Sequence, residues 1–156
     1  LHGLRGEVTF DLFGPVHHAD YWAACQQAIA QLPANVRFTY RGPLPSEAVP
    51  DTLATGYHAL YMPNEGDNFG HTMLEAMCTG LPLLISDRTP WRDLERQQVG
   101  WDLPLNDLSA FTRTIQQLID MDQASFDRWS EGAFAYGLRQ AQDPQALALN
   151  LQLFGA

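Results

Sequence analysis

The chain has 156 residues, of which 46% are apolar and 17% charged, and its 18 acidic and 9 basic residues give a formal net charge of −9. This length is typical of one domain, and a chain of this mass buries roughly 69% of its unfolded surface, so we expect a hydrophobic core rather than disorder. The acidic balance argues against a nucleic-acid or anionic-membrane partner, because both need clustered Lys and Arg. No apolar run approaches the roughly 20 residues of a membrane span, and residues 1–6 lack a signal-peptide pattern.

The cysteines and the first residue bear on where the protein works. Cys25 and Cys78 lie far apart and form no CxxC motif, so the sequence predicts no disulfide framework and a reducing, cytoplasmic setting. The chain does not begin with Met, which indicates a fragment of a longer protein.

Strand and helix signals alternate along the first half of the chain. A strand is expected over 7–14, where Gly and Pro end it, and a helix over 19–32, where apolar residues recur along one face. The β-branched and aromatic run 36–40 predicts a second strand. A short, imperfect helix is expected over 46–55 and a third strand over 58–62.

The second half predicts six further elements, which are a helix over 70–79, a buried strand over 83–85, a short helix over 89–97 started by Pro90, a strand over 100–103, an amphipathic helix capped by Asn106 or Asp107, and a helical tail over 125–154 interrupted at Asp143. Strands separated by helical segments of this length predict a parallel sheet with crossover helices. The sequence therefore predicts one α/β domain over 1–156 with a helical C-terminal tail.

The junction after the third expected strand holds the most informative polar residues. In open parallel sheets, ligands bind beyond the carboxyl ends of the strands, near helix N-termini. Here a polar loop containing Gly follows the strand, and the next helix begins near Gly70. The first amides of that helix, around Gly70, His71 and Thr72, have no intrahelical acceptor and carry the positive end of the helix dipole, which suits a phosphate group.

Acidic residues flank this helix start. Glu75 lies four residues after His71 and three after Thr72, so the three side chains share one helical face. From there its carboxylate is placed to accept hydrogen bonds from two ribose hydroxyls, while Glu65 and Asp67 in the loop are placed to accept from a hydroxylated group beyond the phosphate. The pattern predicts a clamp on a sugar nucleotide. The alternative is that the acidic residues only stabilise the helix dipole.

Several stretches of the sequence resemble one known family. They include Asp67-Asn-Phe-Gly-His71, Glu75-Ala and Gly80-Leu-Pro-Leu-Leu-Ile-Ser-Asp-Arg-Thr-Pro-Trp91. Their order and spacing are similar to those in the nucleotide-sugar-binding half of the retaining family 4 (group 1) glycosyltransferases. Tyr40-Arg-Gly-Pro-Leu44 and Gly100-Trp-Asp102 fit the same pattern, so the resemblance covers nearly the whole chain.

The resemblance implies a fold and roles for particular residues. Family members have two Rossmann-like domains that face each other across a cleft, the GT-B arrangement, and this chain resembles the C-terminal, donor-binding one. The family's two donor-site acids, separated by seven residues, fall on Asp67, which would contact the transferred sugar, and on Glu75, which would hold the ribose. With the residues predicted above, the expected substrate-binding set is Gly42, Leu44, Glu65, Asn68, Phe69, Gly70, His71, Thr72 and Glu75.

Two departures from the family pattern matter. Where the family usually has Glu, this chain has Asp67, one methylene shorter, and Glu65 is the neighbour that could compensate. Family members also carry an Arg and a Lys upstream of the segment that begins this chain, and these neutralise the donor diphosphate. Arg88 and Arg92 are expected to be structural or solvent-facing rather than to replace them.

The resemblance predicts a fragment of a cytoplasmic glycosyltransferase, with a place at the inner face of the membrane left open for the intact enzyme. That enzyme would transfer a sugar from a UDP- or GDP-sugar with retention, without a metal or a cofactor. The acceptor would bind to an N-terminal domain outside this sequence, so the chain alone is expected to be inactive. No nucleic acid is expected as a partner.

The family's strand order predicts an irregular sheet in this chain. In that order, a further strand lies between those expected here over 7–14 and 58–62, and this chain begins after it. Because unpaired buried backbone is costly, these two strands are expected to pair with each other or with another chain. The prediction is a rearranged sheet or a homodimer joined through strands.

Other functions stay open at this stage. One is a flavodoxin-like regulatory module such as a receiver domain, although the chain has no Lys, and another is a GT-B sugar-nucleotide epimerase. No GxGxxG follows an expected strand, which argues against a dinucleotide oxidoreductase. Asp120-Met-Asp122 matches the DxD of metal-dependent transferases but falls at the end of a helix, so we expect a solvated surface there and no metal site.

Overall fold

The computed structural model describes residues 1, 3–63, 65–66 and 70–142. Its elements in chain order are β1 (Val8–Phe13), α1 (Ala19–Ile29), β2 (Val36–Gly42), a 3-10 turn (Ser46–Ala48), α2 (Val49–Leu53), β3 (Leu60–Met62), α3 (His71–Cys78), β4 (Leu83–Ser86), β5 (Gly100–Leu103), α4 (Leu108–Ile119) and α5 (Gln123–Ala141). Strands and helices alternate as the sequence predicts, so the α/β class is confirmed.

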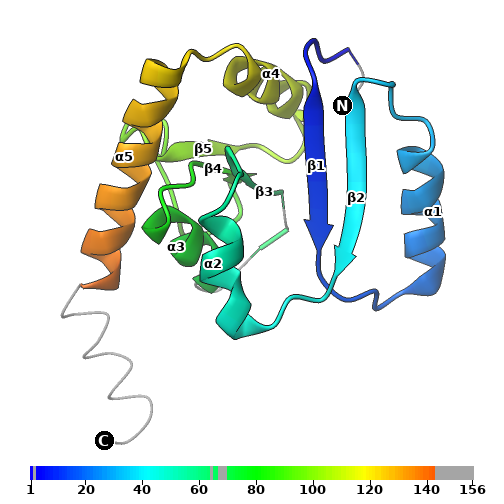
Figure 1. Cartoon of the computed structure of the whole chain (residues 1–156), viewed down its shortest axis with the longest axis horizontal. Helices are drawn as coiled ribbons and strands as arrows, with labels where there is room; N and C mark the ends of the chain where they lie inside the picture. The colour runs from blue at the N-terminus through cyan, green and yellow to red at the C-terminus, as the bar shows by residue number, and fades with distance from the viewer. Residues whose placement is uncertain (2, 64, 67–69, 143–156) are drawn as a thin grey trace, which may run out of the picture.

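All strand pairs are parallel, but the described strands form two sheets rather than one (Figure 1). The first sheet pairs β1 with β2, with Val8 opposite Val36. The second has the order β3-β4-β5, with Leu60 opposite Leu83 and Leu83 opposite Gly100. The predicted parallel pairing is therefore correct, and within the described residues the strands are divided between two sheets.

The two sheets meet through side chains. The rings of Phe10 and Tyr61 lie 5.6 Å apart edge to face, and those of Phe13 and Tyr57 lie 6.2 Å apart. The Tyr57 hydroxyl also donates a hydrogen bond of 2.8 Å to Asp11. The end of β1 therefore contacts the segment before β3, and the middle of β1 contacts β3 itself. Within the described residues, β1 and β3 share no backbone pairing. Direct pairing between them is not observed, and a homodimer joined through strands stays a prediction that a solution mass can test.

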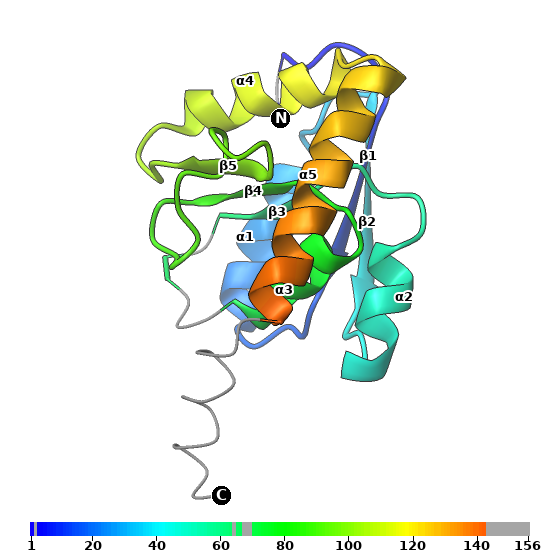
Figure 2. The same ribbon diagram turned by 90° about the vertical axis from the view of Figure 1, so that its left-hand side faces the viewer.

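The main core lies around the second sheet, whose β4 is buried throughout. Leu83 and Ile85 face α3 and α5, whereas Leu84 faces the opposite way, toward Phe111 of α4. Figure 2 shows α5 in front of α3 and of the three strands. The close packing of α5 on α3 depends on Gly137, because a Cβ there would lie 2.8 Å from the Cys78 amide nitrogen.

The clearest error of the sequence prediction is the helix over 89–97, which the structure replaces with turns. The reason is a tertiary contact: the Asp102 carboxylate on β5 accepts hydrogen bonds from the amides of Asp93 and Leu94, at 3.3 and 3.0 Å. Asp93 also has a positive φ of 57°, which a right-handed helix does not allow. Leu94 is completely buried, so the segment follows the packing of the core rather than a helical repeat.

The expected helix termini agree better with the structure. Asp107 caps α4 by accepting from the Ala110 amide, and Asp122 caps α5 by accepting from the Ser125 amide at 2.7 Å. The hydrogen bonds to Ser109 and then Ala110 hold the pKa of Asp107 below its usual range. The predicted interruption at Asp143 and the rest of the helical tail lie outside the described residues.

The DxD-like acids Asp120 and Asp122 therefore lie at helix ends. Asp120 forms an exposed ion pair with Arg5 at 3.4 Å. Over the part of the chain that the structure describes, no group of His, Cys, Asp and Glu residues could hold a metal ion. Within the same residues, no helix has the length and apolar character needed to cross a membrane.

Candidate functional site

The candidate site lies where β3 and β4 end side by side. Because the two strands are parallel, with Met62 opposite Ile85, the loops that follow them leave from the same edge of the sheet. The loop after β3 leads into α3, and the loop after β4 is the turn-rich segment that leads to β5. The two loops touch, since a Cβ on Gly66 would lie 3.7 Å from the Arg88 carbonyl oxygen.

Gly70 begins α3 as its N-cap, in the left-handed conformation with φ 76° and ψ 54°. It is buried, and its carbonyl accepts the first intrahelical bond, from the Leu74 amide at 3.0 Å. The amides at positions 71 to 73 precede that bond, so they form the positive end of the helix, as the sequence predicts. A left-handed N-cap is an unusual start, and only Gly adopts it without strain.

The polar side chains of α3 lie one helical turn apart. His71 is exposed, and Thr72 and Glu75 are half-buried, whereas Met73 and Met77 are buried in the core. Within the described residues the Glu75 side chain forms no hydrogen bond or ion pair, and only its backbone carbonyl accepts one, from the Thr79 amide at 3.1 Å. The carboxylate is therefore open to a ligand. Its charge also acts locally: burial first, and then the Glu75 charge, raise the pKa of the Cys78 thiol, which makes Cys78 a poor nucleophile.

The remaining predicted residues fall in three places. Glu65 lies exposed in the loop before α3. Asp67, Asn68 and Phe69 lie outside the described residues, so their predicted roles stay predictions.

Gly42 and Leu44 lie at the end of β2, in the other sheet, so the structure does not join them to α3 through a shared strand edge. Gly42 has a positive φ of 78°, and its carbonyl accepts a hydrogen bond of 3.0 Å from the Gly14 amide. Leu44 is half-buried. This part of the predicted set therefore lies at the end of β2 and in the loop after it, beside the end of β1.

The sequence of the described site falls within a family match. Residues 9–135 match the family described as "Glycosyl transferases group 1". This match spans more than half of the chain.

The chain belongs to the group 1 glycosyl transferases.

A search of curated proteins found no match to this chain. Membership in the group 1 glycosyl transferases implies, at the level of the family, sugar transfer from a nucleotide-sugar donor. The resemblance inferred from the motifs between Asp67 and Trp91 and from the shorter stretches around them is thereby confirmed.

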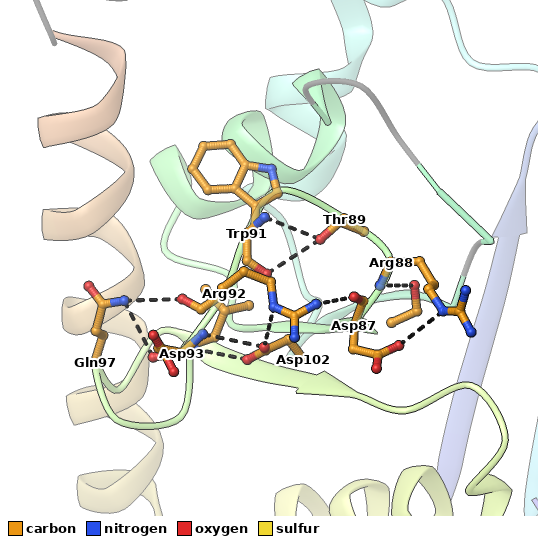
Figure 3. Close-up of polar contacts among 10 residues, drawn as sticks. Asp87, Arg88, Thr89, Trp91, Arg92, Asp93, Gln97 and Asp102 are labelled. Carbon is orange, nitrogen blue, oxygen red and sulfur yellow. Dashed lines mark hydrogen bonds and ion pairs between the residues drawn. The ribbon is translucent and has the colours of Figure 1, made fainter.

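The arginines of this glycosyl transferase domain near the site are engaged in structural contacts (Figure 3). Arg92 donates to the Asp87 carbonyl and pairs with Asp102 at 3.4 Å, and Arg88 pairs with Asp87 at 3.6 Å. Both side chains are more than half exposed. They occupy the structural or solvent-facing positions expected of them.

A second polar cluster joins the two sheets of the transferase domain, and the sequence did not indicate it. The Asp11 side chain is only 5% exposed and accepts from Arg41 at 3.1 Å and from the Tyr57 hydroxyl at 2.8 Å. Its other oxygen, Oδ1, is buried and has no hydrogen-bond partner. Burial first, and then the bond to Asp11, raise the pKa of Tyr57. These residues are far apart in sequence, so no local pattern could have predicted their contact.

Proposed function

We propose that the start of α3 is the donor subsite of a retaining glycosyltransferase that takes a UDP- or GDP-sugar. The amides of the first turn of α3 would hold the diphosphate, and the Glu75 carboxylate would accept hydrogen bonds from the ribose hydroxyls. The observation that carries this proposal is the pairing of a buried, left-handed Gly70 N-cap with an open Glu75 carboxylate one turn later. Asp67 would contact the transferred sugar, with Glu65 as the neighbouring acid.

The chemistry needs a stabilised leaving group. The bond between the anomeric carbon and the diphosphate oxygen breaks, the acceptor oxygen bonds to the anomeric carbon on the same face of the sugar, and the acceptor hydroxyl proton passes to the departing diphosphate. Helix amides stabilise the negative charge that develops on the diphosphate without needing a metal or another cofactor. Acceptor binding is proposed to come from a second domain of the same enzyme, so this chain alone should transfer little or no sugar.

Other parts of the chain support the proposal. The loop from Gly42 to Leu44 is proposed to bind the nucleotide base, and this part of the proposal rests on the family resemblance alone. The net charge of −9 argues against nucleic acid as the alternative ligand. Cys25 and Cys78 are both free thiols, in agreement with the proposed cytoplasmic location.

Calorimetric titration with UDP, GDP and ADP tests the proposal. We expect UDP or GDP to bind, and Glu75→Ala to weaken that binding at least about tenfold, because hydrogen bonds to a charged group contribute about 1.5–3 kcal/mol each. Glu131→Ala, at an exposed position on α5, is the matched control and should leave the affinity unchanged. If the wild-type chain binds neither UDP nor GDP, or if Glu75→Ala binds as well as wild type, the proposed donor subsite is wrong.

The family match leaves the regulatory-module alternative without support. The epimerase alternative is separated by product analysis. A UDP-sugar incubated with the intact two-domain enzyme but no acceptor should return unchanged, and an epimerised sugar among the products would favour the epimerase.

A further inference from the structure

We infer that Trp91 is a positioning residue of the donor subsite: its indole supports the Gly70 turn and so fixes the direction of the first α3 amides. This inference rests on the proposed function. It goes beyond it by assigning a role to the Thr89-Pro90-Trp91 loop, to which the proposed function gives none.

Trp91 lies against Gly70 at the start of α3. A Cβ on Gly70 would lie 2.7 Å from Trp91 Nε1 and 3.3 Å from Trp91 Cδ1. The Met73 sulfur would lie 3.0 Å from the same Cβ. The Gly70 backbone therefore rests directly on the edge of the indole, and Gly is required there for space as well as for its positive φ.

The Trp91 indole is enclosed by its neighbours and cannot move freely. Trp91 is only 7% exposed. On α5, the Tyr136 ring meets the indole edge to face, with centroids 6.2 Å apart. The indole is thus confined between α5 and the start of α3.

The backbone of Trp91 is held by hydrogen bonds within its own loop. The Trp91 amide donates to the Thr89 hydroxyl at 3.3 Å, and that hydroxyl donates in turn to the Trp91 carbonyl at 3.4 Å. Immediately after Trp91, the ion pair of Arg92 with Asp102 ties the loop to β5. Figure 3 shows the indole pointing away from this polar network, so the network fixes the backbone while the ring reaches α3.

These contacts have a consequence for catalysis in an anion site built from backbone amides. Such a site works because its N–H groups already point at the charge before the reaction begins. A displacement of about 1 Å in a positioning group costs on the order of 100-fold in rate. Trp91 is placed to prevent that displacement at Gly70, and it acts through Gly70 rather than on the donor.

The test compares the diphosphate with the rest of the nucleotide. UDP, GDP, uridine and guanosine are titrated into wild type, Trp91→Phe and Trp91→Ala, with Trp129→Phe as the matched control, because Trp129 stacks on Trp101 on the α4 side of the sheet. We expect Trp91→Ala to weaken the binding of the nucleoside diphosphate about tenfold and to leave nucleoside binding unchanged. Trp91→Phe should recover part of the loss, and Trp129→Phe should bind like wild type.

NMR spectra of the indole N–H groups accompany the titration. The chain has four Trp residues, and the indole N–H signal that disappears in Trp91→Phe identifies Trp91. We expect that signal to shift in wild type when UDP or GDP binds. If Trp91→Ala does not fold, Trp91→Phe and this signal decide the question.

The outcomes separate the two claims. Wild type that binds neither UDP nor GDP overturns the proposed function and this inference with it. Suppose instead that wild type binds UDP or GDP. If the Trp91 variants then bind that nucleotide as well as wild type does, or lose as much affinity for the nucleoside as for the nucleoside diphosphate, only the role of Trp91 is overturned.

Discussion

The two sheets of this glycosyl transferase domain differ sharply in how much they bury. In the described part of residues 1–48, Leu4 and Val36 are the buried residues, and α1 contributes none. In the second sheet, by contrast, every residue of β4 is buried and α3 contributes three buried side chains. The amphipathic pattern of α1 is sufficient to predict a helix, but it does not provide a core.

The difference in packing separates the two parts of the proposed site. The start of α3 packs with the well-buried sheet, whereas the loop after Gly42 follows the sparsely packed one. The two sheets are joined by a few contacts, chiefly Tyr57 with Asp11 and Tyr61 with Phe10. We expect the diphosphate subsite to be preformed. The conformation of the loop after Gly42 is expected to depend on what else covers β1 and β2.

The largest expected effect compares core residues of the two sheets. Leu83→Ala on β4, where the side chain is fully buried, should lower the free energy of unfolding by about 2–5 kcal/mol. Leu12→Ala on β1, where the side chain is half-buried, should cost about 1 kcal/mol, because less apolar surface is lost. Chemical denaturation measures both. Equal losses would contradict the contrast between the sheets.

The next effect compares two glycines with nearly the same backbone conformation. Gly70 and Gly42 have φ values of 76° and 78°, but a Cβ on Gly42 would meet nothing within 4 Å. Gly42→Ala should cost about 1–2 kcal/mol, from the left-handed backbone alone. Gly70→Ala should cost about 1–3 kcal/mol more, because Trp91 must also move. Thermal melts of both variants check this, and combining Gly70→Ala with Trp91→Phe should recover part of the additional loss.

A smaller effect concerns the joint between the sheets. Tyr57→Phe removes one donor to the Asp11 carboxylate, which keeps Arg41, and should cost about 1–2 kcal/mol. Because the pKa of Tyr57 is raised above its usual 10.0, its stabilising effect is complete below pH 10 and is lost as pH rises through the folded-state pKa. Wild type should therefore lose stability above pH 10 more steeply than Tyr57→Phe. Tyr21→Phe, at an exposed position, is the control and should match wild type at every pH.

The smallest effect needs no substitution. Amide hydrogen exchange should be faster in β1 and β2 than in β4 and β5, because exchange follows local opening and the first sheet has little buried surface to resist it. Mass spectrometry after a short labelling pulse measures this. Equal protection of the two sheets would indicate that another chain covers the first one in solution.

Local patterns in the sequence predicted much of the fold. Asp107 as a helix cap and the apolar period of α4 are features of neighbouring residues, and both agree with the structure. The motifs from Asp67 to Trp91, with shorter stretches elsewhere, predicted the family that residues 9–135 match. Such predictions succeed because helix periodicity and capping act over about four residues.

The class of the fold, the family and the position of the helix that starts the proposed site could thus be predicted from the sequence alone. Three features emerged only from the three-dimensional structure: the strands form two sheets, residues 89–97 form turns around Asp102, and Trp91 lies against Gly70. The physical reason is the same in each case. These outcomes depend on contacts between residues that are distant in the chain, and such contacts can outweigh the preference of a short segment for helix or strand.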